Sequence, residues 1–423
     1  MLEIQRLRSH KEEILTGLSK RNINATNTIN ELLEMDALWR ENKTQLENIS
    51  AELNQLSRKI GDCFKNNQAQ EAQQFKNETQ ELKAQEAVLK AHVDELDSKI
   101  TTILYSLPNV PHVDVIQGRL PEDNQLIESQ GELPTFSFTA IPHWDLAKKY
   151  QLIDFELGVK VTGAGFPFYR GKGAKLQRAL IAFFLDEADK AGYEEFIAPL
   201  LVNEASGIGT GQLPDKEGQM YYAPEDDLYL IPTAEVPLTN IYRDVLLPNE
   251  DFSIKLTGYT PCFRREAGSY GKDVRGLNRL HQFDKVEIVR IEHPKNSEKA
   301  LNEMVSHVRN LLIKLELPFR ILRLCGGDMG HASAMTFDFE VFSAAQEKWL
   351  EVSSVSRFDT FQSNRLKLRF KDAQKKSHLC HTLNGSALAL PRILAAILEN
   401  NQTPDGITIP SVLQAYTGFD RIT

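Results

Sequence analysis

The chain has 423 residues, a formal net charge of -9 and a sequence pI of about 5.7. A chain of this length buries a sizeable core and is expected to form more than one domain. Its acidic balance excludes a broad electrostatic attraction for nucleic acid, so any such partner would be bound through local basic patches and through shape.

The cysteines are few and dispersed. No Cys-x-x-Cys pair occurs, which argues against a disulfide framework and a zinc ribbon and favours the reducing cytoplasm. Residues 378–381, His-Leu-Cys-His, lack a matching ligand pair elsewhere, so no metal site is expected there. We also expect no signal peptide and no membrane span, since no segment approaches ~20 apolar residues. The four cysteines are Cys63, Cys262, Cys325 and Cys380.

Apolar residues recur in alternating steps of three and four along two consecutive segments near the N-terminus, which predicts heptad seams of paired helices. The first seam comprises Leu32, Met35, Trp39, Leu46, Ile49, Leu53, Leu56, Ile60 and Cys63, with the polar Asn42 inserted. The second comprises Phe75, Leu82, Leu89, Val93, Leu96, Ile100, Ile103 and Leu107, with Thr79 and Glu86 as weak points.

Residues 65–68 form a polar reversal between the seams, so we expect an antiparallel hairpin over about residues 27–105. At 1.5 Å per residue this arm is on the order of 50 Å long. Arms of this kind also serve as dimerisation rods or spacers. Three cations near the tip suit local contact with phosphates, although acids outnumber bases over the whole hairpin. These cations are Arg58, Lys59 and Lys65.

Two prolines, Pro108 and Pro111, end the second helix, and residues 118–134 have the composition of a linker. The expected domains are therefore an N-terminal helical domain at residues 1–110, a linker at 111–134 and a globular domain at 135–423. In the globular part, helices such as residues 175–191 alternate with strands such as 284–292, which predicts an α+β fold.

Two glycine-rich segments, residues 171–173 and 207–211, lack the spacing of a P-loop, and no such motif occurs in the chain. We expect both to be turns or mobile loops.

Further along, residues 231–235 are predicted to begin a helix, with Thr233 as N-cap and Glu235 at the positive helix end. Ordinary capping is a sufficient explanation for both side chains.

The most informative stretch comprises residues 261–268 and 280–287, which predict two strands and the loop between them. Side chains alternate faces along a strand, so Arg264 and Glu266 are expected on one face and Arg265 on the other. A solvated charge cluster would explain the first segment equally well.

On the second strand, Phe283 and Glu287 share a face and lie roughly 13 Å apart. The two strands together would present an aromatic platform, a cation and two acids. An aminoacyl-adenylate needs such a set, since adenine requires a stacking partner, the α-phosphate an arginine, and the amino acid a carboxylate.

Two later segments complete the pattern. Residues 349–354 predict a strand whose acid, Glu351, suits a hard divalent cation. Residues 382–392 predict a tight turn leading into an apolar helix with Arg392 near its start. Pairing and turn chemistry explain each segment alone, but not their order around an Arg-x-Glu hairpin.

Together these segments resemble the seryl-tRNA synthetases of bacterial type, a family of class II aminoacyl-tRNA synthetases, over nearly all of the chain. Residues 192–199 are similar to the first class motif, a helix and strand at a dimer interface, 263–268 to the second motif and 384–392 to the third. The loop at residues 209–214 matches the same family. The resemblance implies a mixed, mainly antiparallel sheet flanked by helices, preceded by the coiled-coil arm.

The function implied by the resemblance is ATP-dependent activation of L-serine to seryl-adenylate, followed by transfer to the 3′ end of serine tRNA and, where present, selenocysteine tRNA. It also implies Mg²⁺, a cytoplasmic homodimer, and an arm that binds the long variable region of the tRNA. Neither step needs a protein nucleophile, because positioning and charge stabilisation suffice.

The resemblance also assigns residues. Serine binding falls to Thr233, Ala234, Glu235, Arg264, Glu287, Asn384 and Ser386. ATP binding falls to Arg264, Arg265, Glu266, Leu280, His281, Gln282, Phe283, Glu351, Val352, Ser353, Ser354 and Arg392. The catalytic residues are Arg264, Glu351 and Arg392, and the Mg²⁺ ligands are Glu351 and Ser354.

Three details depart from simple expectation. In a regular strand Glu351 would share a face with Ser353, so Ser354 needs a bulge or the end of the strand. Ala387 stands where many relatives have glycine, and residues 356–359 differ from the family sequence pattern in what is expected to be a loop.

Three alternative functions are also considered. A carrier-protein ligase should lack the arm, and a catalytically silent homologue should have lost Arg264, Glu287 or Arg392. A purely structural coiled coil would not need the globular part.

Overall fold

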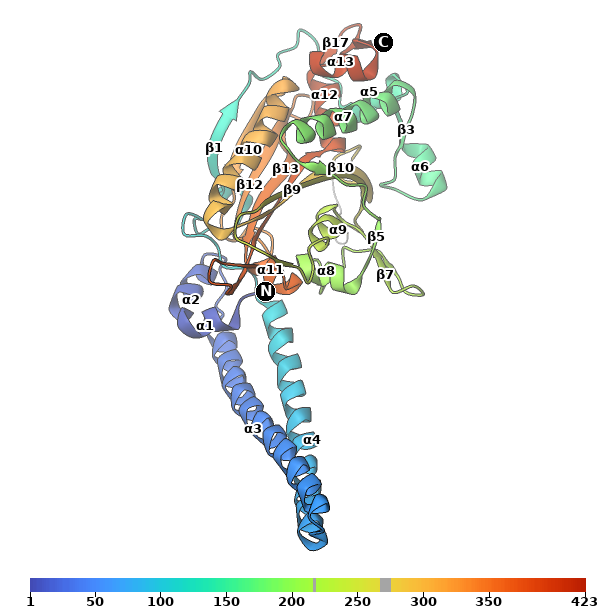
Figure 1. Ribbon diagram of the computed structural model, residues 1–423. Helices are drawn as coiled ribbons and strands as arrows, with labels where there is room; N and C mark the ends of the chain where they lie inside the picture. Colours follow the sequence, from blue (N-terminus) through green and yellow to red (C-terminus); the bar gives the residue numbers. More distant parts are fainter. Residues whose placement is uncertain (216–217, 267–274) are drawn as a thin grey trace. The chain divides into compact units, whose positions relative to one another are not determined.

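The computed structural model describes residues 1–215, 218–266 and 275–423, and the chain divides into two compact units (Figure 1). One unit, the helical unit, comprises residues 2–18 and 23–108. The other, the sheet unit, comprises Met1, residues 19–22 and residues 109–423.

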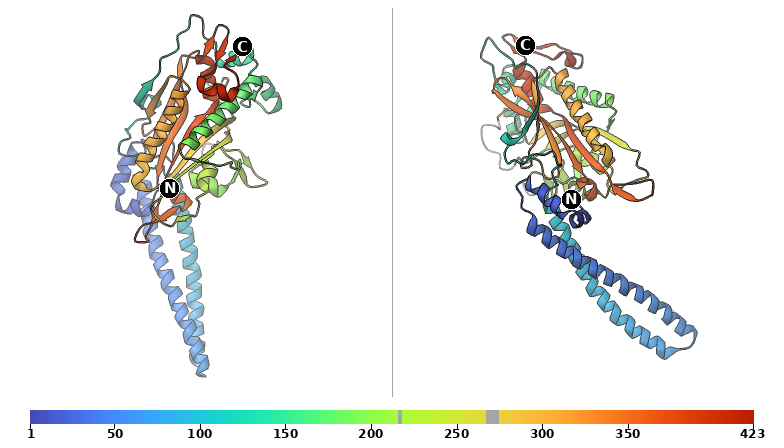
Figure 2. Two further views of the ribbon diagram at one scale, coloured as in Figure 1. Left: turned by 45° about the horizontal axis from the view of Figure 1, so that its top comes forward. Right: turned by 90° about the vertical axis from the view of Figure 1, so that its left-hand side faces the viewer.

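The helical unit contains the predicted hairpin. Its helices are α1 (Ile4–Ser9), α2 (Lys11–Ser19, whose last residue belongs to the sheet unit), α3 (Thr26–Lys65) and α4 (Ala69–Ser106). The long helices α3 and α4 run side by side, as both views in Figure 2 show. All residues of both predicted seams are buried or half-buried. The heptad spacing therefore predicted the hairpin and its contact faces correctly.

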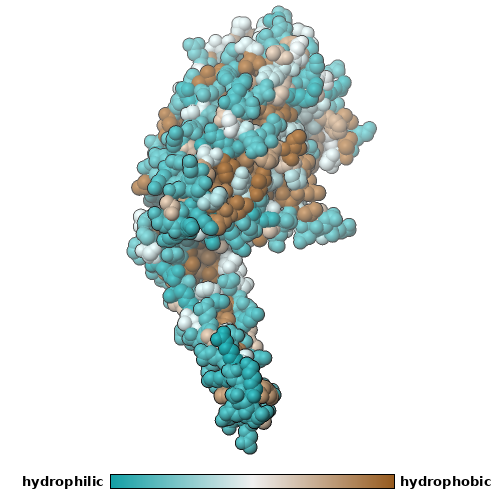
Figure 3. Space-filling model, viewed as in Figure 1, coloured by the Kyte–Doolittle hydropathy of each residue, from teal (hydrophilic) through white to brown (hydrophobic). Residues whose placement is uncertain are grey.

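Polar residues within the seams have local partners. Glu86 accepts a hydrogen bond from the hydroxyl of Ser50 at 2.7 Å, which joins the two helices, and the Thr79 hydroxyl donates to the carbonyl of Phe75 at 2.7 Å. Asn42 is buried in α3. The surface of the hairpin in Figure 3 is mostly hydrophilic, as expected for two helices whose apolar stripes face each other.

The sheet unit is organised by an eight-stranded sheet among the described residues. Its strands, in spatial order, are β1 (Gln125–Gln130), β11 (Phe319–Arg323), β12 (Met335–Ser343), β13 (Lys348–Asp359), β16 (His381–Ala389), β10 (Gln282–Glu292), β9 (Ser253–Phe263) and β4 (Glu194–Glu195). All neighbours pair antiparallel except β4 and β9, which are parallel. The mixed, mainly antiparallel sheet is therefore confirmed.

One face of this sheet is covered by α7 (Gly171–Lys190), α10 (Ser297–Lys314) and α12 (Leu390–Asn400) (Figure 1). In α10 the buried residues recur at helical spacing, so the helix presents one apolar stripe to the sheet. In β16 the residues Leu383 and Ala387 belong to this apolar core, whereas Asn384 and Ser386 alternate with them. The opposite face thus carries the polar side chains.

Smaller elements surround the sheet. The remaining helices are η1 (Pro121–Asp123), α5 (His143–Lys149), α6 (Phe155–Val161), α8 (Glu204–Thr210), α9 (Glu235–Asn240), η3 (Pro294–Asn296), α11 (Phe361–Leu366) and α13 (Ser411–Thr417). The remaining strands are β2 (Ile153–Asp154), β3 (Phe168–Tyr169), β5 (Leu201–Asn203), β6 (Tyr222–Ala223), β7 (Leu228–Leu230), β8 (Leu246–Leu247), β14 (Arg369–Lys371), β15 (Ser377–Leu379), β17 (Gln402–Thr403), β18 (Gly406–Thr408) and β19 (Arg421–Ile422).

Several predicted elements were wrong. Residues 171–173 and 207–211 are helical rather than loops: the first segment opens α7, and the second lies in α8 up to its left-handed cap at Gly211. Residues 382–389 form a central strand rather than a turn, because both faces of β16 are buried and its small residues fit there. Residues 111–134 contain β1, which pairs with β11 at the edge of the sheet.

Among the residues that the structure describes, no helix is long and apolar enough to cross a membrane. The four cysteines are free and buried. His378 contacts Asp372 at 2.7 Å, whereas His381 contacts Ser297 at 2.9 Å. The two histidines of the His-Leu-Cys-His segment thus have separate partners.

Candidate active site

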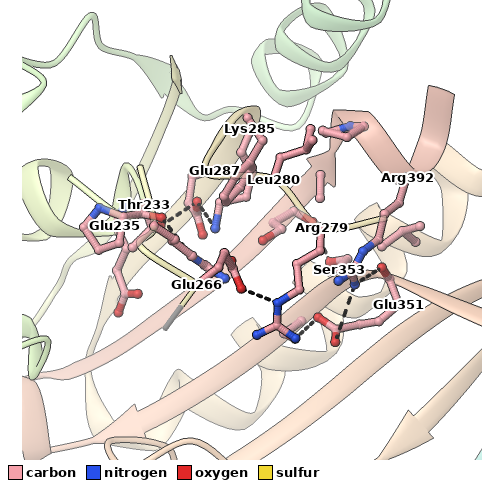
Figure 4. A pocket seen from close by; sticks show the side chains of 18 of the residues that line it. Thr233, Glu235, Glu266, Arg279, Leu280, Lys285, Glu287, Glu351, Ser353 and Arg392 are labelled. Carbon is pink, nitrogen blue, oxygen red and sulfur yellow. Dashed lines mark hydrogen bonds and ion pairs between the residues drawn. The ribbon is translucent and has the colours of Figure 1, made fainter. Parts of the chain in front are cut away.

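A pocket of about 530 Å³ opens on the polar face of the large sheet. Its walls come from β10, β13 and β16, the residues that follow β9, and the starts of α9 and α12. We call Thr233, Glu235, Lys285, Glu287 and Asn384 its buried end, and Glu266, Arg279, Glu351, Ser354 and Arg392 its open end. Figure 4 shows Thr233, Lys285 and Glu287 gathered on one side and Glu351 and Arg392 on the other.

Glu287 organises the buried end. It lies in the middle of β10 and is 1% exposed. Its carboxylate accepts hydrogen bonds from the Thr233 hydroxyl at 2.7 Å and the Asn384 amide at 2.6 Å, and pairs with the Lys285 ammonium at 2.7 Å. A buried carboxylate is tolerated only when it is paired in this way, so its geometry is set before any ligand binds.

Glu235, the first residue of α9, provides a second buried acid. Burial and then the charge of Glu287 raise its pKa to about 7, although the Gln362 amide donates to it at 2.6 Å and opposes the shift. The Thr233 hydroxyl accepts a hydrogen bond from the Glu235 N–H at 3.2 Å. The predicted N-cap was nevertheless wrong, because the N-cap residue of α9 is Ala234 and not Thr233. The Thr233 hydroxyl proton is instead donated to Glu287.

Arg264 lies just beyond the end of β9 at Phe263. Its guanidinium lies over the ring of Phe283, 5.2 Å from the centroid, and its Nε donates to the Pro232 carbonyl at 3.4 Å. The strand prediction was therefore wrong for residues 264–266, yet Arg264 does face the pocket.

Glu266 lines the pocket as predicted, but not because it alternates with Arg264 along a strand. Its φ is +49°, a left-handed conformation that redirects the chain after β9. Its carboxylate forms an ion pair with Arg279, which also lines the pocket. Residues 267 and 268, the end of the expected second class motif, lie outside the described residues.

Arg392 and Glu351 frame the open end from opposite elements. Arg392, in the first turn of α12, donates from Nε to the Asn278 carbonyl at 3.1 Å and from Nη1 to the Glu351 backbone carbonyl at 2.6 Å. Its guanidinium is also 3.8 Å from the Glu351 carboxylate, whose side chain is 50% exposed. The helix with Arg392 near its start was predicted correctly.

The bulge that Ser354 requires is present. Phe339 pairs with Ser353 and Glu340 with Glu351, so Val352 is the extra residue in β13. As a result the Ser354 hydroxyl lies 3.3 Å from the Glu351 carboxylate. Residues 356–359 continue this strand rather than forming a loop, and Ala387 faces the apolar core.

The residues around Glu351 suit a hard divalent cation. Asp338, opposite Ser354 in the sheet, has a buried Oδ1 without a hydrogen-bond partner, and burial followed by the charge of Glu351 raises its pKa well above the usual range. A bound cation would favour the charged form of both carboxyl groups. The described residues contain no group of three or more His, Cys, Asp or Glu side chains placed to hold a metal.

Most of the residues proposed from sequence come together in this pocket, but four do not line it. Ala234 is fully buried, His281 lines a neighbouring cavity, the Arg265 N–H donates to the Gln219 carbonyl at 2.8 Å, and Gln282 begins β10. The proposed residues that do line the pocket are Thr233, Glu235, Arg264, Glu266, Leu280, Phe283, Glu287, Glu351, Val352, Ser353, Ser354, Asn384, Ser386 and Arg392.

Sequence reasoning missed Lys285, Asn278, Arg279 and Gln362. Lys285 lies between Phe283 and Glu287 on the same face of β10, so the alternation that selected those two would have found it. No local pattern marks the other three. The residues that a catalytically silent homologue would have lost, Arg264, Glu287 and Arg392, are all present in the pocket.

Comparisons with known proteins identify the family of the chain. Residues 221–401 match the family model of the tRNA synthetase class II core domain (G, H, P, S and T), and residues 1–111 match that of the seryl-tRNA synthetase N-terminal domain. The chain is 48% identical to the serine–tRNA ligase of Salinibacter ruber over 100% of this chain and 99% of that protein. It is 43% identical to the serine–tRNA ligase of Methylacidiphilum infernorum over 98% and 99%.

Solved structures show the same similarity. The crystal structure of seryl-tRNA synthetase from Pyrococcus horikoshii complexed with ATP matches with a TM-score of 0.91 and 32% identity, covering 100% of this chain and 99% of that chain. The cytoplasmic serine–tRNA ligase of Naegleria fowleri in complex with AMP matches with a TM-score of 0.86 and 26% identity over the same shares. The chain belongs to the seryl-tRNA synthetase, or serine–tRNA ligase, family of class II aminoacyl-tRNA synthetases.

Proposed function

We propose that the pocket on the large sheet activates L-serine with ATP and transfers the seryl group to tRNA, with serine at the buried end and ATP at the open end. The observation that carries this placement is the division of the pocket into a buried polar end, where Glu287 has three partners, and a more exposed end that carries the guanidinium groups of Arg279 and Arg392. A small polar amino acid fits the first and a polyphosphate the second.

At the buried end, Glu235 and Glu287 would attract the serine ammonium, while Thr233, Asn384 and Ser386 would supply hydrogen-bonding groups. An analogue lacking the serine hydroxyl would leave buried polar groups unpaired, which is a strong basis for discrimination. Ala234, Arg265, His281 and Gln282, which do not line the pocket, would support their neighbours through the backbone.

In the first step a serine carboxylate oxygen would attack the α-phosphorus, and the bond to the bridging oxygen of pyrophosphate would break. Arg264 would hold the serine carboxylate against the α-phosphate and stabilise the developing charge. Phe283 and Arg392 would hold adenine between them, with Glu266 at its edge. In the second step the 3′-terminal hydroxyl of tRNA would attack the seryl carbonyl, and AMP would leave.

Glu351 and Ser354 would hold Mg²⁺, which supplies neutralisation and orientation of phosphate oxygens when bound. Asp338 supports this assignment because its buried carboxyl oxygen has no other partner. The Arg392 contact with Glu351 would keep the carboxylate directed towards the same side of the pocket.

The proposed domain roles follow the chain. Residues 1–110, with the hairpin at about 27–105, would bind the variable region of serine tRNA, residues 111–134 would connect, and residues 135–423 would catalyse. Support comes from the length and hydrophilic surface of α3 and α4, with Arg58, Lys59 and Lys65 near the tip.

A homodimer is proposed from residues 192–199 and their surroundings. Ile197 is 95% exposed and Leu201 45% exposed, close to the edge strand β4. Large apolar side chains this exposed are typical of surfaces covered by a partner. A cytoplasmic location is proposed because the substrates ATP and tRNA are found there, and free cysteines agree with it.

The direct test is aminoacylation with the purified full-length chain, ATP, Mg²⁺ and serine tRNA. Serine should be attached, while alanine, threonine and cysteine should not. Charging of another amino acid in preference to serine, or no charging at all, would contradict the proposed function.

A further inference from the structure

A fully buried acid–imidazole pair lies next to the open end of the pocket. His143 begins α5 and Glu399 is near the end of α12, and both side chains are 0% exposed. The Glu399 Oε1 atom lies 2.7 Å from His143 Nδ1 and accepts the His143 backbone N–H at 2.9 Å. Its other oxygen accepts from the hydroxyl of Ser343. Nothing in the proposed reaction uses this pair.

The second nitrogen of His143 is occupied by the backbone of the pocket wall. The N–H of Leu277 donates to His143 Nε2 at 2.9 Å. A backbone N–H can only donate, so Nε2 must be the acceptor and Nδ1 must carry the proton that is donated to Glu399. The imidazole is therefore held as one neutral tautomer between α12 and residue 277.

Gly276 makes this approach possible. Its φ is +67°, and a Cβ at this position would lie 2.3 Å from His143 Nε2. Any side chain would therefore push the imidazole away from the Leu277 N–H. The close contact requires glycine on grounds of both conformation and space.

The segment that His143 fixes continues directly into the pocket wall. Leu277, Asn278, Arg279 and Leu280 all line the pocket. Asn278 provides the carbonyl that accepts from Arg392 Nε, and its side-chain amide donates to Gln346 at 2.8 Å. Gln346 in turn donates to Glu399 at 3.1 Å. The buried pair thus supports Asn278, whose carbonyl contacts Arg392, in two ways: His143 binds the backbone of the neighbouring Leu277, and Glu399 binds Gln346, the partner of the Asn278 side chain.

We infer that His143 is a positioning residue for the ATP side of the pocket: supported by Glu399, it holds residues 276–280 so that the Asn278 carbonyl orients Arg392 before ATP binds. This inference rests on the proposed placement of ATP at the open end. It predicts that breaking the His143–Leu277 bond weakens ATP binding and leaves serine binding unchanged.

Two substitutions at position 143 separate its two bonds. In His143→Asn the amide reaches only as far as Nδ1, so the Glu399 bond is kept and the Leu277 bond is lost. In His143→Gln the amide reaches as far as Nε2 and restores an acceptor for Leu277. In serine-dependent pyrophosphate exchange, His143→Asn should raise the KM for ATP about tenfold, the usual cost of an unpaired buried donor. The KM for serine should stay within about twofold, and His143→Gln should recover most of the loss.

Asn400→Ala is the matched control. Asn400 is also buried at the end of α12 and makes two hydrogen bonds, with Phe342 and Ala344, but none of them leads to residue 277. It should lower the melting temperature without changing the KM for ATP. An equal rise in this KM for Asn400→Ala, an unchanged KM for His143→Asn, or no recovery in His143→Gln would overturn the inference. A wild-type chain without exchange activity would instead contradict the proposed function.

Hydrogen exchange on the unmodified chain decides the matter even if the variants do not fold. The Leu277 amide should be strongly protected without ATP, at a level close to amides of β10, since its acceptor is already in place. Exchange of this amide at the rate of an exposed loop, with protection only after ATP is added, would show that His143 does not position the wall in advance.

Discussion

The two ends of the pocket handle charge in opposite ways. At the buried end, Glu287 is paired with three partners and is 1% exposed, because an isolated charge at this depth would be very costly. At the open end, the side chains of Glu351 and Arg392 are 50% and 32% exposed, and such ion pairs contribute little by themselves. The fold therefore sets the buried end, while the open end leaves charge for its ligand to complete.

The largest effect is expected where both ends meet. Replacing Arg264 with alanine removes the cation from the point where charge develops, so serine-dependent pyrophosphate exchange should fall about a thousandfold. Arg265→Ala, outside the pocket, should stay within about threefold of wild type. Equal losses for the two variants would show that Arg264 has no special place between the ends.

A test outside the pocket comes next. Replacing residues 27–105 with a short linker should leave serine-dependent exchange nearly intact, because every proposed contact with serine or ATP lies after residue 232. Charging of serine tRNA should fall at least about a hundredfold, since the contacts with the variable region are lost. Normal charging by the shortened chain would identify the hairpin as a spacer or an assembly element.

A smaller effect should appear in the pH dependence of serine binding. With a pKa of about 7, Glu235 in the ligand-free protein becomes protonated as the pH falls through 7 and no longer attracts an ammonium group. Serine affinity should then fall by up to about tenfold per pH unit below 7. Calorimetric titrations between pH 5.5 and 8.5 measure this, and Glu235→Gln should abolish the dependence.

The same shift has the opposite sign for folding. A carboxyl group whose pKa is raised in the folded state binds its proton more tightly there than in the unfolded chain. Its contribution to the free energy of unfolding therefore increases as the pH falls from about 7 towards the ordinary pKa of the group, 4.5.

For the binding experiment, a serine affinity of the wild-type chain that does not change with pH would contradict the role proposed for Glu235.

The hairpin could be predicted almost completely from the sequence. Heptad spacing is a local pattern, and the apolar character of each position in it indicates that this side chain is buried between the two helices. The position of residues 65–68 at the turn follows from the same pattern. In the pocket, by contrast, Phe283 and Glu287 could be placed together only because they share one strand.

Other parts of the site depend on contacts between distant segments. Residues 382–389 contain an asparagine and a glycine, which are typical of a turn, yet they form a strand. A Cβ atom added to Gly385 would lie 3.3 Å from Met304 Cε, which shows how closely α10 covers this strand. Asn278 and Gln362 meet their partners from positions far away in the chain. No spacing rule can predict such contacts.

The central claim is that serine occupies the buried end and ATP the open end. Titrating each ligand separately into Glu287→Gln and Glu351→Gln, with Mg²⁺ present, tests it most directly. Each substitution keeps the size of the side chain and removes its charge. Glu287→Gln should weaken serine binding by at least about tenfold and leave ATP affinity unchanged, while Glu351→Gln should do the reverse. A loss of ATP affinity before serine affinity in Glu287→Gln, or equal losses of both ligands in both variants, would contradict the claim.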